Sequence, residues 1–228
     1  MKIAIAADAP GTSARVAARA GARPFVRHHR RYEQWFERHR AAYVSELLAV
    51  RALLPWRGRG LEIGVGTGRF AGPLGVEFGI DPAPEMLDYA GARGVRVASA
   101  VAEALPFAQA AFDHALIVTT ICFVADAGAM LKEAHRVLRP RGELVIGFID
   151  RTSDLGRHYL AHQEESVFYR EATFFSAQEV QQLLSDTGFS EPVWAQTLFK
   201  PLAETREIEP VRADRGRGAF VVVKARRA

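Results

Sequence analysis

Residues 61–68 read Leu61-Glu62-Ile63-Gly64-Val65-Gly66-Thr67-Gly68, a short apolar strand that runs into three glycines at alternate positions. A helix is expected directly afterwards, over Arg69–Leu74. Glycines in such a turn permit a tight bend and let backbone N–H groups approach a ligand without obstruction by a Cβ atom. The turn follows the carboxyl end of the first strand, where open parallel sheets bind their ligands. The segment therefore predicts a ligand site.

A second strand, Val76–Ile80, is followed by Asp81, whose carboxylate can accept hydrogen bonds from the two hydroxyls of a ribose. The spacing Gly-x-Gly-x-Gly differs from the Gly-x-Gly-x-x-Gly of dinucleotide folds. Glu62, two residues before Gly64, would be an unfavourable neighbour for a pyrophosphate. It would instead stabilise a ligand that carries an ammonium and a sulfonium. These features favour S-adenosylmethionine, which has both positive charges and no phosphate.

Strand and helix patterns alternate along the chain, which is typical of crossover units around a parallel sheet. Further strands are expected at Gly60–Ile63, Val95–Ala98, Phe112–Val118, Gly142–Ile149, Val193–Phe199 and Ala219–Lys224, and helices at Pro84–Arg93, Ala127–Leu138 and Ser176–Thr187. The segment Pro201–Arg217 is expected to be a charged loop. We therefore predict an α/β fold with a doubly wound, mostly parallel seven-stranded sheet and a C-terminal antiparallel strand.

Apolar residues between His28 and Leu54 recur at intervals of three and four, which indicates an amphipathic helix or a helix pair. Pro55 ends this segment. We expect residues 1–54 to form an N-terminal extension and helical lid, and residues 55–228 to form the cofactor-binding domain. Within the extension, residues 1–7 are apolar and are expected to form a strand.

The composition, 49% hydrophobic and 25% charged over 228 residues, is that of an ordinary globular domain. No apolar run is long enough for a membrane span or a signal peptide. One cysteine, Cys122, excludes an internal disulfide and a cysteine-based metal cluster, and it is expected to be buried in a strand. The net charge of +4 comes with no recognised nucleic-acid motif. We expect a soluble, cytoplasmic monomer or homodimer without nucleic-acid, membrane or metal partners.

The sequence resembles the class I S-adenosylmethionine-dependent methyltransferases, especially the small-molecule branch related to ubiquinone and menaquinone methyltransferases. Four segments match in order and spacing, namely Leu61–Leu74, Gly79–Leu87, Ala102–Asp113 and Val137–Leu144. The resemblance covers roughly residues 24 to 190. It implies transfer of a methyl group from S-adenosylmethionine to a small-molecule acceptor, by in-line displacement at the sulfonium methyl.

The resemblance also implies which residues bind the methionine end of the cofactor. Glu62 should organise the glycine loop and meet the methionine ammonium, directly or through water. The methionine and ribose portions should be lined by Gly64, Gly66, Thr67 and Gly68. Val118 and Thr119 should close this end after the fourth strand.

At the nucleoside end, the resemblance implies that Asp81 binds the ribose hydroxyls. Pro82 and Met86 should pack against the adenine, and the backbone of Ala102 and the side chain of Glu103 should border its polar edge. Many relatives have an Asp where this chain has Val101. Adenine recognition should therefore depend more on the backbone.

Acceptor contacts are expected from the N-terminal helix and from the insert between the fifth and sixth strands. The candidates are Tyr32, Trp35, His158, Tyr159 and Tyr169. His158 and His162 share a helix face, but no third metal ligand accompanies them. A general base is optional. An amine acceptor can react if it binds in its deprotonated form, whereas a hydroxyl or a carbon acid requires a base that removes its proton. The sequence therefore identifies no catalytic residue.

Two other functions stay open at this point. An NAD(P)-dependent oxidoreductase is disfavoured by the glycine spacing, by Glu62 and by the absence of a Tyr-x-x-x-Lys pair, since Gln163 stands four residues after Tyr159. Binding assays with S-adenosylmethionine and with NAD(P) would distinguish a methyltransferase from an oxidoreductase. A non-catalytic regulator that binds the cofactor would carry the same glycine loop. Only a measurement of catalytic turnover would distinguish it from an enzyme. The acceptor atom is not identified by the sequence.

Overall fold

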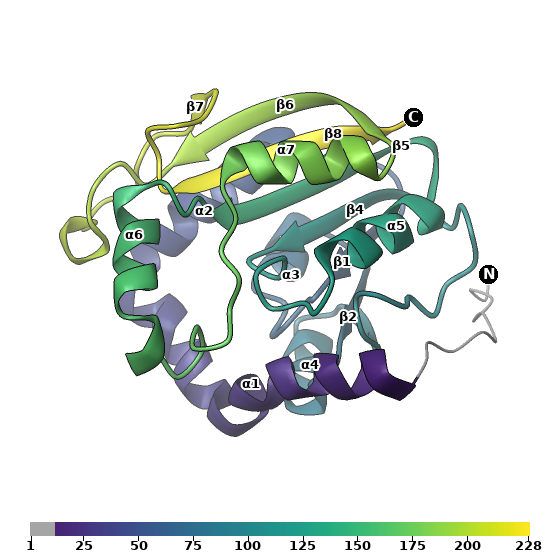
Figure 1. Cartoon of the computed structure of the whole chain (residues 1–228), viewed down its shortest axis with the longest axis horizontal. Helices are drawn as coiled ribbons and strands as arrows, with labels where there is room; N and C mark the ends of the chain where they lie inside the picture. The colour runs from purple at the N-terminus through teal and green to yellow at the C-terminus, as the bar shows by residue number, and fades with distance from the viewer. Residues whose placement is uncertain (1–11) are drawn as a thin grey trace.

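The computed structural model describes residues 12–228, so the strand expected at residues 1–7 lies outside the described residues. The strands are β1 (Gly60–Ile63), β2 (Phe78–Asp81), β3 (Arg96–Ser99), β4 (Phe112–Val118), β5 (Leu138–Ile149), β6 (Phe189–Thr197), β7 (Arg212–Ala213) and β8 (Phe220–Arg227). They form one sheet in the order β3-β2-β1-β4-β5-β8-β6-β7 (Figure 1). Strands β1 to β5 are parallel to one another, and β8 runs antiparallel to β5 and β6.

This topology confirms the predicted doubly wound, mostly parallel sheet with an antiparallel last strand. The predicted number of seven strands is wrong by one. Arg212 and Ala213, inside the segment expected to be a charged loop, pair with Gln196 and Ala195 of β6. A two-residue edge strand has too few residues to show a periodic pattern, so the sequence does not reveal it.

Seven helices flank the sheet in the described part of the chain. They are α1 (Thr12–Arg38), α2 (Arg40–Leu53), α3 (Ala71–Leu74), α4 (Pro84–Ala92), α5 (Ala127–Val137), α6 (Asp154–Ala161) and α7 (Ala177–Asp186), with 3₁₀ turns at Gln163–Glu165 and Leu202–Glu204. Figure 1 shows α5 and α7 in front of the sheet and α2 and α3 behind it.

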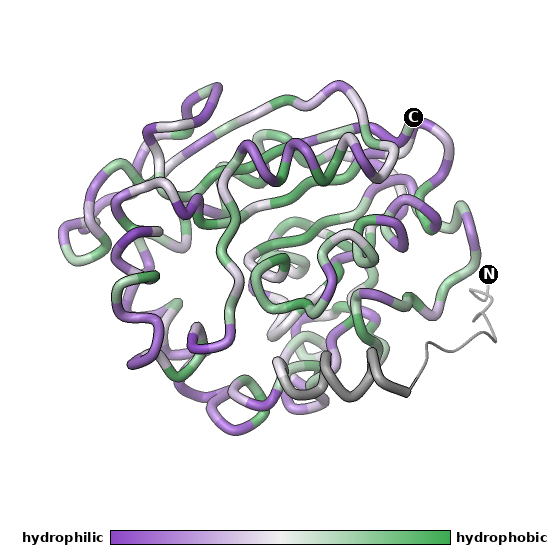
Figure 2. The backbone as a smooth tube through the Cα atoms, in the orientation of Figure 1, coloured by the Kyte–Doolittle hydropathy of each residue, from purple (hydrophilic) through white to green (hydrophobic). Residues whose placement is uncertain are grey.

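Alternating side chains of the central strands point into two separate hydrophobic clusters. Ile146 of β5 and Val223 of β8 pack in one cluster with residues of α5 and α7. Val145 and Val222, their neighbours in sequence, pack on the opposite face with residues of α2 and α3. Strands covered on both faces are apolar almost throughout, as the green stretches along the sheet in Figure 2 show.

The expected N-terminal helical segment is a pair, α1 and α2, separated at His39. Helix α1 contains Pro24 and bends at His28, whose backbone is not helical. Helix α2 packs against β5, β6 and β8. Helix α1 lies beside α4 (Figure 1), where Ala22 packs with Met86. This arrangement brings α1 over the carboxyl ends of β1 and β2.

Cys122 is not in a strand, contrary to the prediction. It lies in the turn after β4 and is partly exposed. The chain leaves the strand at Thr119, whose φ of 49° is left-handed. In residues 12–228 we find no helix with both the length and the apolar character that a membrane crossing requires.

Candidate active site

The glycine loop, residues 64–68, connects β1 to α3, and all three of its glycines have positive φ. A Cβ atom at Gly64 would lie 2.3 Å from Thr120, and one at Gly68 would lie 3.0 Å from Ala90. A Cβ at Gly66 would lie 3.6 Å from its nearest neighbours, Met86 Cε and the Tyr32 hydroxyl. Packing therefore requires glycine at the first and last positions, while the middle position borders open space.

Asp81, at the end of β2, anchors this loop. Its Oδ2 accepts a hydrogen bond from the Gly66 amide (3.0 Å), and its Oδ1 accepts one from the Ala83 amide (2.9 Å). Burial raises the pKa of Asp81 to about 6, although the hydrogen bonds from the two amides lower that pKa. Each carboxylate oxygen has a second lone pair, and Asp81 lines the cavity described below. Asp81 can therefore accept two ribose hydroxyls while it holds the loop, a second role that the sequence did not indicate.

Glu62 lies beneath the loop and is 2% exposed. Its Oε2 has no hydrogen-bond partner among the described residues. Burial raises the pKa of Glu62 well above its usual range, and the amide of Ala71 offsets this only in part. A buried carboxyl oxygen without a partner is costly until a donor or a cation reaches it. The position fits a bound ligand that carries an ammonium group.

A cavity of about 520 Å³ opens at the carboxyl ends of β1, β2 and β4. This volume lies within the range of small-molecule sites, roughly 300–1,000 Å³. The predicted cofactor residues that line it are Gly64, Gly66, Asp81, Pro82, Met86, Ala102, Glu103, Val118 and Thr119. The other three, Glu62, Thr67 and Gly68, are buried and do not line it. Most of the predicted cofactor residues thus surround one space.

Glu103 lines the cavity but also supports the chain around it. Its Oε1 accepts hydrogen bonds from the amides of Ala125 (2.8 Å) and Asp126 (3.3 Å), just before α5. Its Oε2 is buried and has no partner among the described residues. Val101 borders the same part of the cavity, so no side-chain acceptor stands at that position.

Thr120 is a residue of this site that the sequence did not single out. Its hydroxyl donates to the carbonyl oxygen of Gly64 (3.2 Å), which ties the end of β4 to the glycine loop. The neighbouring Thr119 has the left-handed backbone that non-glycine residues seldom adopt and that is frequent at functional sites. The pair fixes the wall between the two halves of the cavity.

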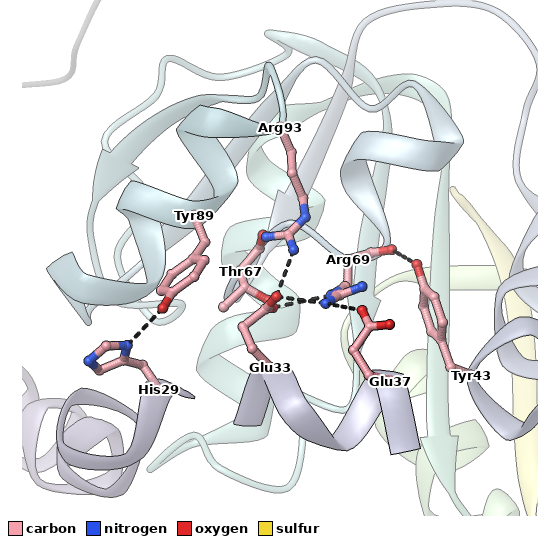
Figure 3. A network of polar contacts seen from close by, with 8 residues as sticks. All are labelled: His29, Glu33, Glu37, Tyr43, Thr67, Arg69, Tyr89 and Arg93. Carbon is pink, nitrogen blue, oxygen red and sulfur yellow. Dashed lines mark hydrogen bonds and ion pairs between the residues drawn. The ribbon is translucent and has the colours of Figure 1, made fainter. Parts of the chain in front are cut away.

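Helix α1 is tied to the glycine loop by the ion pairs of Figure 3. Glu33 Oε2 lies 2.7 Å from Arg69 Nη2 and 2.6 Å from Arg93 Nη2. Arg93 also donates to the carbonyl oxygen of Thr67 (2.7 Å). Burial tends to raise the pKa of Glu33, but the hydrogen bonds from the two arginines outweigh it and lower that pKa. Each partner lies in a different element, so sequence patterns gave no sign of the network.

Aromatic side chains line a large part of the cavity. Of the five predicted acceptor residues, Tyr32, Trp35, Tyr159 and Tyr169 line the cavity and His158 does not. Tyr159 and Tyr169 stack with ring centroids 5.0 Å apart, and Phe123 stacks on Tyr169 at 5.5 Å. Phe168, another aromatic residue of the insert, also lines this part, as does Phe25, which the sequence did not indicate.

The His158 and His162 rings do lie on one side of α6, with centroids 4.4 Å apart. His162 lines the cavity, and His158 is exposed outside it. In the part of the chain that the structure describes, no cluster of three or more His, Cys, Asp or Glu side chains could hold a metal ion.

Glu46 of α2 is a further residue of the site that the sequence did not single out. Its side chain is 5% exposed and lines the aromatic part of the cavity. Burial raises the pKa of Glu46 to about 8. A signal was present in the sequence, since Glu46 stands four residues from both Ala42 and Val50 and so shares their buried helix face.

The comparisons with known proteins agree with this geometry. Residues 61–146 match the family described as a methyltransferase domain. An uncharacterised protein of Methanocaldococcus jannaschii is 41% identical over 201 residues, which are 88% of this chain and 97% of that protein. A ubiquinone biosynthesis O-methyltransferase of Azorhizobium caulinodans is 30% identical over 186 residues, covering 72% of this chain and 74% of that enzyme.

A crystal structure from Thermotoga maritima is similar over nearly the whole fold. That protein is described as an S-adenosylmethionine-dependent methyltransferase and possible histamine N-methyltransferase. It is 50% identical, with a TM-score of 0.89, and the match covers 91% of this chain and 100% of that one. The glycine loop, Asp81 and Glu62 suit the cofactor of these enzymes, which has ribose hydroxyls and an ammonium to satisfy. The chain belongs to the class I S-adenosylmethionine-dependent methyltransferases, and S-adenosylmethionine is its cofactor.

Proposed function

We propose that the chain transfers the methyl group to a small-molecule amine held in the aromatic part of the cavity. One observation carries this proposal. The cavity is continuous from Asp81 at the nucleoside end to Tyr159 and Tyr169 at the aromatic end. A methyl acceptor bound among these rings would therefore share one enclosed space with the cofactor.

The residues of the cofactor half are proposed to act as follows. Asp81 accepts hydrogen bonds from the ribose hydroxyls, and Glu62 stabilises the ammonium through the loop. Val118 and Thr119 separate the methionine end from the acceptor. When bound, S-adenosylmethionine supplies a sulfonium methyl group that is a good electrophile.

The acceptor half is proposed to align the nucleophile and to exclude water. Tyr32 and Trp35 of α1 form one wall, and Tyr159 and Tyr169 form another. Alignment of two bound reactants can lower a barrier by as much as about 7–11 kcal/mol. Methyl transfer therefore does not require a catalytic side chain beyond one that handles the proton of the acceptor.

An amine acceptor is supported by the similarity to the Thermotoga maritima protein, which is described as a possible histamine N-methyltransferase. Aromatic rings also attract cations through their π faces. The nicotinamide-dependent oxidoreductase considered above is not favoured, because the relatives with a described activity are methyltransferases.

The division into a lid (residues 1–54) and a cofactor-binding domain (residues 55–228) is carried forward as part of the proposal. Helix α1 supplies the covering wall of the cavity through Ala22, Phe25, Tyr32 and Trp35. Its ion pairs to the glycine loop are suited to hold such a cover closed.

The test is a transfer experiment with methyl-labelled S-adenosylmethionine and a fractionated metabolite extract. We expect the label to enter a low-molecular-weight amine, identified by mass spectrometry. An Asp81→Ala variant serves as the control and should transfer little label. Label found in protein or nucleic acid, or in no compound at all, would contradict the proposal.

A further inference from the structure

Glu46 is a buried acid that the cofactor half of the site does not use. Its side chain is 5% exposed, and the part that remains accessible faces the cavity. Within the described residues, burial is the only influence that shifts its pKa, and no hydrogen bond or ion pair reaches its carboxylate. Burying an unpaired carboxylate is costly, so the position calls for a partner.

No side chain of the described residues is paired with Glu46. Arg31, Arg38 and His162 also line the cavity, but none of them shifts the pKa of Glu46. The three tyrosines of the cavity, Tyr32, Tyr159 and Tyr169, lie close enough for the charge of Glu46 to raise their pKa values. His39 also lines the cavity, and burial together with Arg38 lowers its pKa. Phenols carry no positive charge, and the lowered pKa of His39 disfavours the charged form of its imidazole. A bound ligand that carries a cation can therefore compensate the ionised form of Glu46.

We propose that Glu46 recognises the methyl acceptor, by pairing with the ammonium group of an amine and accepting one of its protons. This inference rests on the function proposed above and names a residue for it. The stacked rings of Tyr159 and Tyr169 would hold the body of the amine, and Glu46 would select its charge.

The chemistry balances with no further reactant. A proton passes from the ammonium nitrogen to the Glu46 carboxylate, which leaves a neutral amine with a free lone pair. That lone pair forms the new nitrogen–carbon bond as the carbon–sulfur bond of the sulfonium breaks and its electron pair stays on sulfur. The methylated nitrogen then carries the positive charge, and Glu46 releases its proton to solvent after the product leaves.

The acidity of Glu46 is suited to this exchange. Burial raises the pKa of Glu46 to about 8. This value is closer to the pKa of an alkylammonium, about 10, than the pKa of an exposed carboxyl group is. Proton transfer is efficient when the two pKa values are similar and the acceptor's pKa lies near the working pH.

The test compares 2-phenylethylamine with 2-phenylethanol, which share a carbon skeleton and differ in the ammonium group. Each compound, and histamine as a second amine, is titrated by calorimetry into protein saturated with S-adenosylhomocysteine. We expect the wild type to bind an amine about ten-fold or more tightly than the alcohol. In Glu46→Gln this preference should disappear, whereas Glu46→Asp, which keeps the charge, should retain part of it.

Glu165→Gln is the matched control, because Glu165 also lines the cavity but is exposed. It should keep the preference for the amine. Equal affinities for amine and alcohol in the wild type, including no binding of either, would overturn the role of Glu46. So would an unchanged preference in Glu46→Gln.

The two proposals fail in different ways. Affinity for S-adenosylhomocysteine should be the same in Glu46→Gln and in the wild type, because Glu46 lies outside the cofactor half. If the label enters only a neutral hydroxyl compound, the proposed transfer to a small molecule would stand, but the role of Glu46 would be overturned. Absence of transfer to any small molecule would overturn the proposed function itself.

Discussion

Asp81 and Glu46 are two carboxyl groups that line one cavity and have different partners. Asp81 accepts hydrogen bonds from two backbone amides, whereas Glu46 accepts none within the described residues. Burial raises both pKa values, to about 6 and about 8. Each group therefore changes its charge in a pH range where the protein can be studied.

Cofactor affinity should depend on the ionisation of Asp81. The ionised carboxylate can accept both ribose hydroxyls, and its protonated form accepts less well. With a pKa of about 6, roughly a tenth of the groups are ionised at pH 5. Calorimetry with S-adenosylhomocysteine should show about ten-fold weaker binding at pH 5 than at pH 7.5. Asp81→Asn should show no such step, and a wild-type affinity that is constant over this range would contradict the role of Asp81.

Removal of the Asp81 side chain should weaken cofactor binding by taking away both its charge and its hydrogen-bond acceptors. Asp81→Ala leaves two ribose hydroxyls and the Gly66 amide without their acceptor. We expect cofactor binding to weaken by about 1–3 kcal/mol, the usual cost of an unsatisfied buried donor. Unchanged affinity in a calorimetric titration would exclude the ribose contact.

The free energy of unfolding should respond to Glu46 in a defined pH window. The folded-state pKa, about 8, lies above the ordinary value of 4.5, so between these pH values the folded protein binds a proton that the unfolded chain has released. Stability from this group therefore falls as the pH rises from about 4.5 to 8. Glu46→Gln should be more stable than the wild type at pH 8.5, by up to a few kcal/mol, and should show little gain at pH 4.5. Thermal unfolding at both pH values is the measurement, and an equal difference at both would refute the shift.

At the scale of elements, two acids of α1 pair with arginines near the glycine loop, and Glu33 is the more buried of them. Glu33, whose side chain is 13% exposed, pairs with Arg69 and Arg93 together, and its partners belong to the loop and to the end of α4. The loss of one member of such a partly buried network leaves the remaining charges without compensation. The helix would then be held by its apolar contacts, which it makes with α4 and with residues of α2 and α3.

Glu33→Gln should therefore loosen α1 and speed release of the cofactor. We expect a cost of about 1–3 kcal/mol in stability, faster hydrogen exchange in residues 21–38 and faster dissociation of S-adenosylhomocysteine. Glu37→Gln is the control, because the Glu37 side chain is 63% exposed and such pairs contribute about 0–1 kcal/mol. Hydrogen exchange in α1 equal to that of the wild type would show that the ion pairs do not hold the helix.

The bounds of a helix or strand were predicted correctly where the element has a long run of buried apolar residues. Strand β4 has the predicted bounds, Phe112–Val118, because its residues are apolar almost throughout. Strand β5 begins at Leu138, four residues before the predicted Gly142. The intervening Arg139-Pro140-Arg141 is exposed and resembles a loop, and the pairing with β4 shifts register there. Solvent-facing strand ends carry no apolar pattern, so the sequence predicts them poorly.

At the scale of the whole molecule, the cofactor half was predictable and the acceptor half was only partly so. The glycine loop and Asp81 lie in consecutive segments, at strand ends that the sheet topology brings together. The acceptor half combines α1, α2, α6 and the turns after β4 and β6, which only tertiary packing assembles. Glu46 belongs to this half, and its importance follows from the absence of a partner, which no local pattern reveals.

The most direct test of the central claim, that one cavity holds both the cofactor and the acceptor, is a crystal structure of the protein soaked with S-adenosylhomocysteine. We expect the ribose hydroxyls to bind the Asp81 carboxylate, and the thioether sulfur to lie near Thr119 and to face Tyr159 and Tyr169. Density at another site, or a sulfur turned away from the aromatic rings, would contradict it.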